Sequence, residues 1–171
     1  MSDVFPGDII FCHGTGFLNA MIRAGERLRM RNSEATYWSH VAIVVEPVDG
    51  RPRIVQAGSN GVDYAWLSDV DVHYQVVSSD DFPTLLTWTP SRLDIIAQAH
   101  ALVGAKYGWL TIASIVMNLL TPKWVRFPDF RRGSTYICSA AAAWCLHAGG
   151  AKIDTYDIYQ IFPSELRALA R

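Results

Sequence analysis

Cys138 stands where a thiol could act as a nucleophile. It opens the run Cys-Ser-Ala-Ala-Ala-Ala-Trp-Cys-Leu-His-Ala, which Gly149 and Gly150 follow. This pattern predicts a helix that is capped by Ser134 or Thr135 and ended by the two glycines. A thiol in the first helical turn lies at the positive end of the helix dipole, which favours the thiolate. The chemistry that this position indicates is attack on a carbonyl, with first-turn N–H groups available to the developing oxyanion.

Such a thiol needs a base, and His40 is the best candidate in the sequence. Residues 39–46 alternate as a strand does, so we expect His40 near its start, on the same face as Ala42 and Val44. In a papain-type site the thiol faces a histidine from the adjacent sheet. Each residue alone has a simpler explanation, with Cys138 as a small core residue and His40 bonded to a backbone carbonyl. Their combination favours the catalytic interpretation.

The third member of such a site depends on strand register. Glu46 shares the face of His40 but lies roughly 20 Å along the strand, which is too far. Gln56 lies on the next predicted strand. Direct pairing of positions 40 and 56 requires a loop centred on Val48, whereas a two-residue turn at 49–50 would place Gln56 on the opposite face. If the register allows it, we expect the amide oxygen of Gln56 to accept the Nδ1 proton of His40.

The remaining pattern predicts a single α+β domain over residues 1–171, with a small antiparallel sheet packed against the buried helix that carries Cys138. The predicted strands are 5–11, 39–46, 53–57, 62–66 and 73–78. The predicted helices are 18–31, 91–103, 109–120 and 136–147, before a mixed segment at 154–171. For the helix over 91–103 we expect an inner face of Leu93, Ile96, Ala97 and Ala101.

Composition excludes several classes of function. A net charge of -1 and a pI of about 6.5 exclude a nucleic-acid-binding footprint. The three cysteines form no Cys-x-x-Cys pair and no ligands cluster, so we expect free thiols, no metal and no cofactor. The N-terminus lacks the basic and apolar regions of a signal peptide. We therefore expect a cytoplasmic protein, with a peripheral-membrane position or release by cell lysis left open.

One strongly apolar stretch has two interpretations. Residues 109–120 form about three helical turns and are followed by Pro122, so they are too short for a bilayer, which takes roughly 20 residues. A buried helix is the simplest interpretation. The alternative is contact with a membrane surface through residues 109–127, because Lys123 and Arg126 lie among apolar residues directly after the stretch.

Six short segments together resemble one family. They are Pro6–Phe11, Trp38–Val45, Val55–Ala57 followed by Gly61-Val62, Gly104–Gly108, Tyr136–Ser139 and Phe162–Leu166. In order and spacing the chain is similar to the NlpC/P60 superfamily of cysteine hydrolases, in the circularly permuted branch with the YiiX-like bacterial proteins and the lecithin–retinol acyltransferase relatives. The resemblance implies a papain-like fold with Cys138 as nucleophile, His40 as base and Gln56 as third member, where the family often has a histidine or an acidic residue.

The resemblance implies a thiol-dependent hydrolase or acyltransferase that forms a thioacyl-enzyme without a cofactor. Its relatives act on peptidoglycan peptides and on lipid acyl groups, so the expected substrate is a peptide or a lipid. We expect Tyr136, His13 and Ser139 to border that substrate. Two alternatives stay open: a non-catalytic module that binds a membrane or a partner, and a thiol-dependent inhibitor or scaffold.

Overall fold

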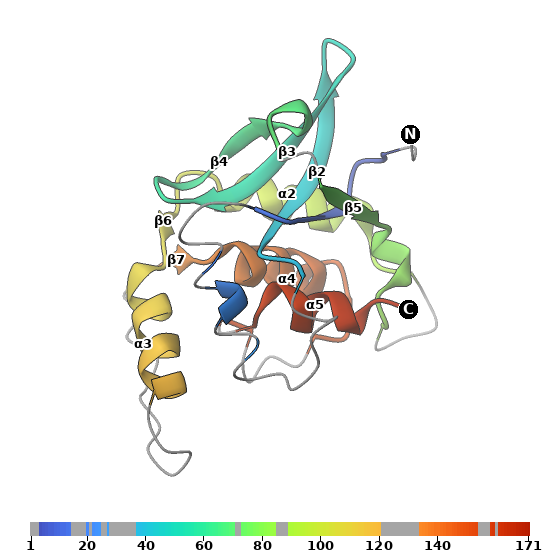
Figure 1. Ribbon diagram of the computed structural model, residues 1–171. Coiled ribbons are helices and arrows are strands. Elements are labelled where there is room, and N and C mark those ends of the chain that lie inside the picture. Colours follow the sequence, from blue (N-terminus) through green and yellow to red (C-terminus); the bar gives the residue numbers. More distant parts are fainter. Residues whose placement is uncertain are drawn as a thin grey trace.

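The chain folds into an α+β structure built on one five-stranded antiparallel sheet (Figure 1). The computed structural model describes residues 4–14, 20, 22–24, 27, 37–70, 73–84, 89–120, 134–153, 158–159 and 161–171. The sheet contains β1 (Ile9–Cys12), β2 (His40–Val48), β3 (Arg51–Gly58), β4 (Gly61–Trp66) and β5 (Tyr74–Val77) in the order β4-β3-β2-β1-β5. The helices are α2 (Arg92–Leu102), α3 (Trp109–Leu120), α4 (Cys138–Ala148) and α5 (Pro163–Leu169). These elements confirm the predicted strands and three of the four predicted helices, and those of residues 18–31 that are described are helical.

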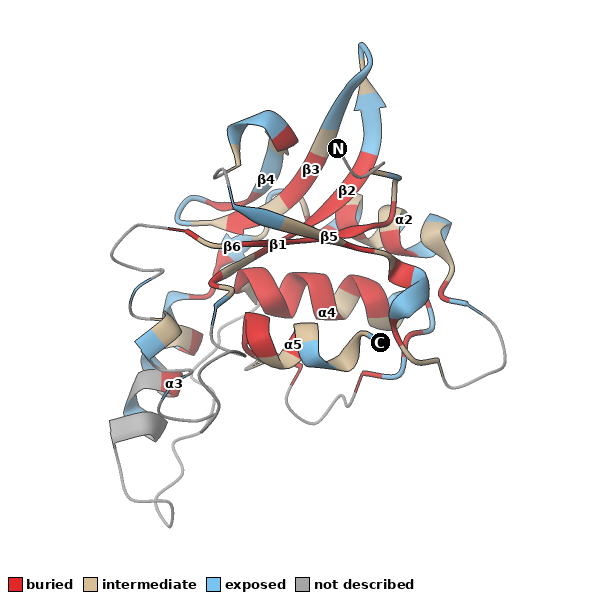
Figure 2. Ribbon diagram, turned by 45° about the vertical axis from the view of Figure 1, so that its right-hand side comes forward, coloured by how far each residue is buried: buried red, intermediate tan, exposed pale blue. Residues whose placement is uncertain are grey.

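The sheet is covered by helices on one face. Side chains of alternate residues point to opposite faces of a strand, and Val41, Ile43 and Val45 of β2 belong to the same buried cluster as α4. Helix α4 lies directly under the sheet, with α5 beyond it, and nearly all of α4 is buried (Figure 2). A fully buried isoleucine or leucine contributes roughly 1.5–3 kcal/mol, so this layer is the main source of stability around the Cys-bearing helix. Ala42 and Val44 belong to a second, smaller cluster on the other face.

The alanines of α4 allow its neighbours to approach closely. Eight residues of α4 are buried, and four of them form the run Ala140–Ala143. Helix α2 packs against α4, and a Cβ atom added at Gly149 would lie 2.5 Å from Cγ1 of Ile95. The predicted inner face of α2 was wrong. The buried residues are Ile95, Ala99 and Leu102, while Leu93 is 80% exposed. Apolar residues lie all round α2, so periodicity alone could not choose between the faces.

The β2–β3 hairpin combines a tight turn with a bulge. Asp49 and Gly50 both have positive φ, at 51° and 73°, which is the geometry of a two-residue type I′ turn. Val48 pairs with Arg51 beside this turn, but the register then shifts, and Val45 pairs with Arg53. One extra residue of β2 is thus absorbed at Glu46–Pro47, where proline has no N–H for the ladder. The bulge moves every later pair of the hairpin by one residue.

Helix α4 starts directly after a short parallel ladder. Residues Thr135–Tyr136 form β7, which pairs with β6 (Lys106–Tyr107). The N–H of Gly108 donates to the carbonyl oxygen of Tyr136 over 3.0 Å. The predicted cap at Ser134 or Thr135 is therefore wrong, because this segment is held in the ladder. Ile137 is the N-cap residue, without a side-chain capping bond, and Gly149 ends the helix as predicted.

The described helices also bear on the membrane question. In the part of the chain that the structure describes, no helix has the length and apolar character needed to cross a bilayer.

Candidate active site

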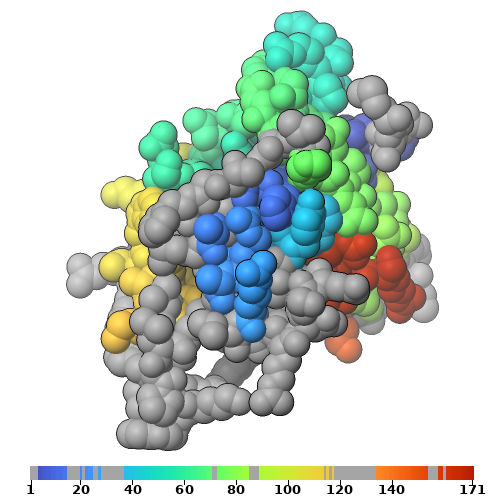
Figure 3. Space-filling view, in the orientation of Figure 1, coloured from blue at the N-terminus to red at the C-terminus, as the bar shows by residue number. Residues whose placement is uncertain are grey.

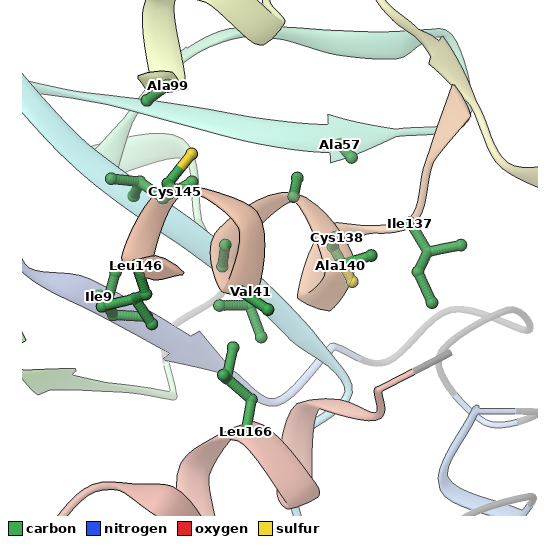
Figure 4. Close-up of a cluster of buried hydrophobic side chains, with 14 of the residues drawn as sticks. Ile9, Val41, Ala57, Ala99, Ile137, Cys138, Ala140, Cys145, Leu146 and Leu166 are labelled. Atoms are coloured by element: carbon green, nitrogen blue, oxygen red, sulfur yellow. The ribbon is translucent and has the colours of Figure 1, made fainter. Parts of the chain in front are cut away.

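Cys138 is the first residue of α4 and is 3% exposed. The parallel ladder holds the chain extended up to Ile137, whose ψ of 162° is far from helical, and the helix starts one residue later. The thiol is consequently fixed between the sheet and the first helical turn (Figure 4). The first N–H groups of a helix have no intrahelical carbonyl partner, so this end of α4 presents backbone donors beside the sulfur.

The structure brings Gln56 to His40. The Nε2–H group of His40 donates to Oε1 of Gln56 over 2.7 Å. Gln56 pairs with Ala42 across the ladder, and Ala42 lies two residues from His40. The two side chains are therefore diagonal neighbours on one face, a spacing of about 7–8 Å between Cα atoms that long side chains can bridge. The predicted alternatives for the hairpin are both incomplete, because the two-residue turn exists but the bulge returns Gln56 to the face of His40.

The ring nitrogen differs from the prediction. We expected Gln56 to accept the Nδ1 proton, whereas the bond forms at Nε2. Nδ1 is then the ring nitrogen that remains for the thiol of Cys138. Gln56 lies diagonally from His40 and not directly opposite it, because it pairs with Ala42.

Cys138 and His40 perturb one another in opposite directions. Burial by itself would raise the pKa of Cys138, but the charge of His40, its hydrogen bond and the N–H groups of Val41 and Ser139 lower the pKa of the thiol. Burial would likewise lower the pKa of His40, but the charge and hydrogen bond of Cys138, together with Gln56, raise the pKa of the imidazole. Both shifts favour the ion pair of thiolate and imidazolium.

Tyr107 is a neighbour of the thiol that the sequence analysis did not single out. It lies in β6 and is 8% exposed. Burial, and then the negative charge of Cys138, raise the pKa of its phenol, so the hydroxyl stays protonated and can donate. The signal was present in the segment Gly104–Gly108, but only the ladder between β6 and β7 shows that this segment lies beside Cys138.

The three residues predicted to border the substrate have different positions. His13 follows Cys12, the partner of His40 across β1 and β2, so it lies at the same end of the sheet. Its Nδ1–H group donates to the carbonyl oxygen of Tyr37 over 2.7 Å, and its ring stacks on that of Tyr37. Tyr136 is partly exposed and directly precedes Ile137.

Ser139 has a structural contact instead. Its side chain is fully buried, and its hydroxyl donates to the carbonyl oxygen of Ile161 over 2.5 Å. This bond ties the first turn of α4 to the segment before α5. The backbone N–H of Ser139 contributes to the lowered pKa of Cys138, so only the main chain of this residue faces the thiol.

The other candidate groups serve structural contacts. Glu46 pairs with Arg53 and accepts from Nε2 of His100 over 2.8 Å, away from His40. Asp8 accepts from the N–H of Phe5 within the turn and pairs with Arg92, as expected for a turn residue. Among the described residues, no three His, Cys, Asp or Glu side chains gather closely enough to hold a metal ion.

Comparison with models of known protein families and with curated protein sequences gave no match. The arrangement holds a thiol with a lowered pKa, a histidine that is oriented by an amide, a neutral phenol and the N-terminus of a helix. Together these groups can deliver a nucleophile, transfer a proton and stabilise negative charge on an oxygen.

Proposed function

We propose that the chain is a cysteine hydrolase or acyltransferase with a papain-like fold of the circularly permuted NlpC/P60 type. The observation that carries the proposal is the joint arrangement of Cys138, His40 and Gln56, which come from α4, β2 and β3. A buried thiol whose only task was to fill the core would have a raised pKa, whereas the pKa of Cys138 is lowered. The helix-borne thiol, the strand-borne histidine and the antiparallel sheet support the papain-like interpretation.

The reaction would begin with the thiolate of Cys138 attacking the carbonyl carbon of an amide, ester or thioester. The imidazolium of His40 then protonates the leaving amine, alcohol or thiol, and the carbon–heteroatom bond breaks. A thioacyl-enzyme remains. The neutral His40 then takes a proton from water or from a second acceptor as that group attacks the thioester. The acyl group leaves bonded to its acceptor, and the thiolate of Cys138 and the imidazolium of His40 are restored. Gln56 keeps the imidazole turned with Nδ1 toward the sulfur.

Two groups could stabilise the oxyanion that forms during each attack. The backbone N–H groups at the start of α4 lie at the positive end of the helix dipole. The hydroxyl of Tyr107, which burial and the charge of Cys138 keep protonated, would be the second donor. Removing one such donor costs about 10²–10³ in turnover in well-studied sites.

The substrate class follows from the resemblance alone and includes peptidoglycan peptides and lipid acyl or amide groups. The three cysteines of the chain are free and buried. Free thiols support a reducing compartment, and we therefore include a cytoplasmic site of action in the proposal.

Trapping of the thioacyl-enzyme tests the proposed reaction. The protein is mixed with activated esters, thioesters and anilides of short peptides and of fatty acids, quenched in acid, and examined by intact-protein and peptide mass spectrometry. We expect an acyl adduct on the peptide that contains Cys138 and loss of that adduct in hydroxylamine. Cys138→Ala should form none, while the matched Cys145→Ala variant should acylate as the wild type does.

One combination of results would contradict the proposed reaction. If none of these reagents acylates Cys138 while iodoacetamide also fails to label it at neutral pH, the thiol is not activated. The proposal is then overturned in favour of a non-catalytic module that retains the fold.

A further inference from the structure

Helix α3 exposes an apolar stripe that the proposed chemistry does not use. Trp109 is 51% exposed, Leu110 46% and Met117 40%, and Ala113 between them is also exposed. At about 100° per residue these four positions fall within one arc of about 100° around the helix axis. Solvent-exposed leucines occur singly on most proteins, but a continuous stripe along one helix face indicates a contact surface.

The opposite side of α3 already packs against the protein. Thr111 and Ile115 are buried, and they lie about 100° or more away from the exposed stripe. The helix projects from the sheet and its covering helices in both ribbon views (Figures 1 and 2). In the space-filling view its yellow to orange atoms lie at the left edge of the molecule (Figure 3). The exposed stripe is thus an outward face and not a part of the core.

Charge indicates the kind of partner. The twelve residues of α3 include no charged side chain. Lys106 is exposed just before the helix. In the sequence that follows the helix, residues 121–133 carry Lys123, Arg126, Arg131 and Arg132 against the single acid Asp129. An apolar helix face with a tryptophan at its start, preceded and followed in the sequence by basic residues, suits the interface of an anionic bilayer, where each basic residue adds about 1 kcal/mol.

We propose that the stripe Trp109–Leu110–Ala113–Met117 of α3 docks on the surface of an anionic lipid bilayer. The helix lies in the plane of the interface and does not cross the membrane. Trp109 contacts the ring of Tyr107 edge-on, with centroids 4.9 Å apart, and Tyr107 neighbours Cys138. Docking through α3 therefore places the membrane close to the thiol. The docking surface does not depend on the proposed reaction, and it can be tested on the resting protein.

Vesicle flotation tests the surface directly. The full chain is mixed with vesicles of phosphatidylcholine containing about a third phosphatidylserine, and with vesicles of phosphatidylcholine alone. We expect binding to the anionic vesicles that weakens at high salt. The double variant Leu110→Gln/Met117→Gln should lower the partition coefficient at least tenfold, since two partly buried apolar side chains are lost from the lipid.

The control is another exposed leucine. Leu93→Gln changes a side chain that is 80% exposed on α2 and should leave binding unchanged. Circular dichroism and the rate of Cys138 labelling must match the wild type in every variant, which separates a folding defect from a loss of docking. The proposal is overturned if the wild type fails to float, or if the double variant floats equally well. It is also overturned if ultracentrifugation shows instead a dimer that the double variant abolishes.

Discussion

Helix α4 carries two cysteines, one at its first residue and one in its C-terminal half, and the pKa values of the two thiols shift in opposite directions. Cys138 and Cys145 are both buried, at 3% and 0% exposure, and both lie in the same alanine-rich helix (Figure 4). Burial raises the pKa of Cys145 to about 12. The same burial acts on Cys138, yet His40 and two backbone N–H groups lower its pKa. Burial alone therefore does not set the direction of the pKa shift of a thiol in this helix. At Cys138 the interactions with His40 and the backbone N–H groups outweigh it.

Helix α4 has two roles, packing in the core and holding the thiol of Cys138. The C-terminal half of α4 fills the space between the sheet and α2, where a small apolar side chain is all that is required. The N-terminal residue, Cys138, belongs to the same core cluster but also interacts with His40 and Val41 at the start of β2. A buried, alanine-rich helix that packs in the core can therefore also hold a reactive thiol at its first residue.

The largest expected effect comes from exchanging the thiols one at a time. Cys138→Ala should abolish rapid labelling by iodoacetamide at pH 7, a loss of at least about a hundredfold, because Cys12 and Cys145 are buried and burial raises the pKa of Cys145. Cys145→Ala should change the labelling rate less than about twofold. Peptide mass spectrometry assigns the label. Rapid labelling of Cys145 in the Cys138→Ala protein would show that the two sites do not differ as described.

A smaller effect is expected from the group that orients His40. Gln56→Leu leaves the Nε2–H of His40 without its acceptor, which costs about 1–2 kcal/mol, or roughly a tenfold loss of Cys138 labelling near neutral pH. Gln56→Glu supplies a carboxylate, further raises the pKa of His40 and should restore the labelling rate. Asp63, directly opposite Gln56 on β4, provides the control as Asp63→Asn. Equal losses in Gln56→Leu and Asp63→Asn would indicate a general disturbance of the hairpin.

The smallest effect concerns stability. Cys145→Ala removes one sulfur from a fully buried position, and we expect about 1 kcal/mol of lost stability. Urea unfolding followed by circular dichroism measures it, with the slope unchanged if only packing is lost. An unchanged midpoint would mean that the core beside α2 contracts to fill the space.

Much of the fold could be predicted because its strands alternate regularly and its turns are marked by glycine. The five strands and the helices around Ile95, Ile115 and Cys138 follow from these patterns. The inner face of α2 could not be chosen, since apolar residues surround it. The cap of α4 was misplaced because Thr135 is a good capping residue in isolation, whereas here its backbone belongs to a ladder with β6.

For the candidate site, too, features set by the local sequence could be predicted, whereas features set by contacts between distant residues could not. Residue type and position made Cys138 and His40 candidates, and the structure brings these two side chains together. The place of Gln56 depended on register, and neither simple hairpin described it. The missing element was the bulge at Glu46–Pro47, for which the proline was a readable signal. Tyr107 could not be placed because the partner of its two-residue strand lies far away in the sequence.

The pH dependence of Cys138 labelling in wild type and His40→Ala tests the central claim most directly. Iodoacetamide reacts with the thiolate, so its rate should rise through a midpoint well below the free-thiol value of about 8.5. In His40→Ala the charge and the hydrogen bond of the imidazole are lost while burial and the N–H groups of Val41 and Ser139 remain, so the midpoint should move up. In the proposed reaction the imidazolium protonates the leaving group, so turnover should fall at higher pH as His40 loses its proton, above the usual histidine range. An ordinary midpoint in both proteins, or no labelling in either, would contradict the account.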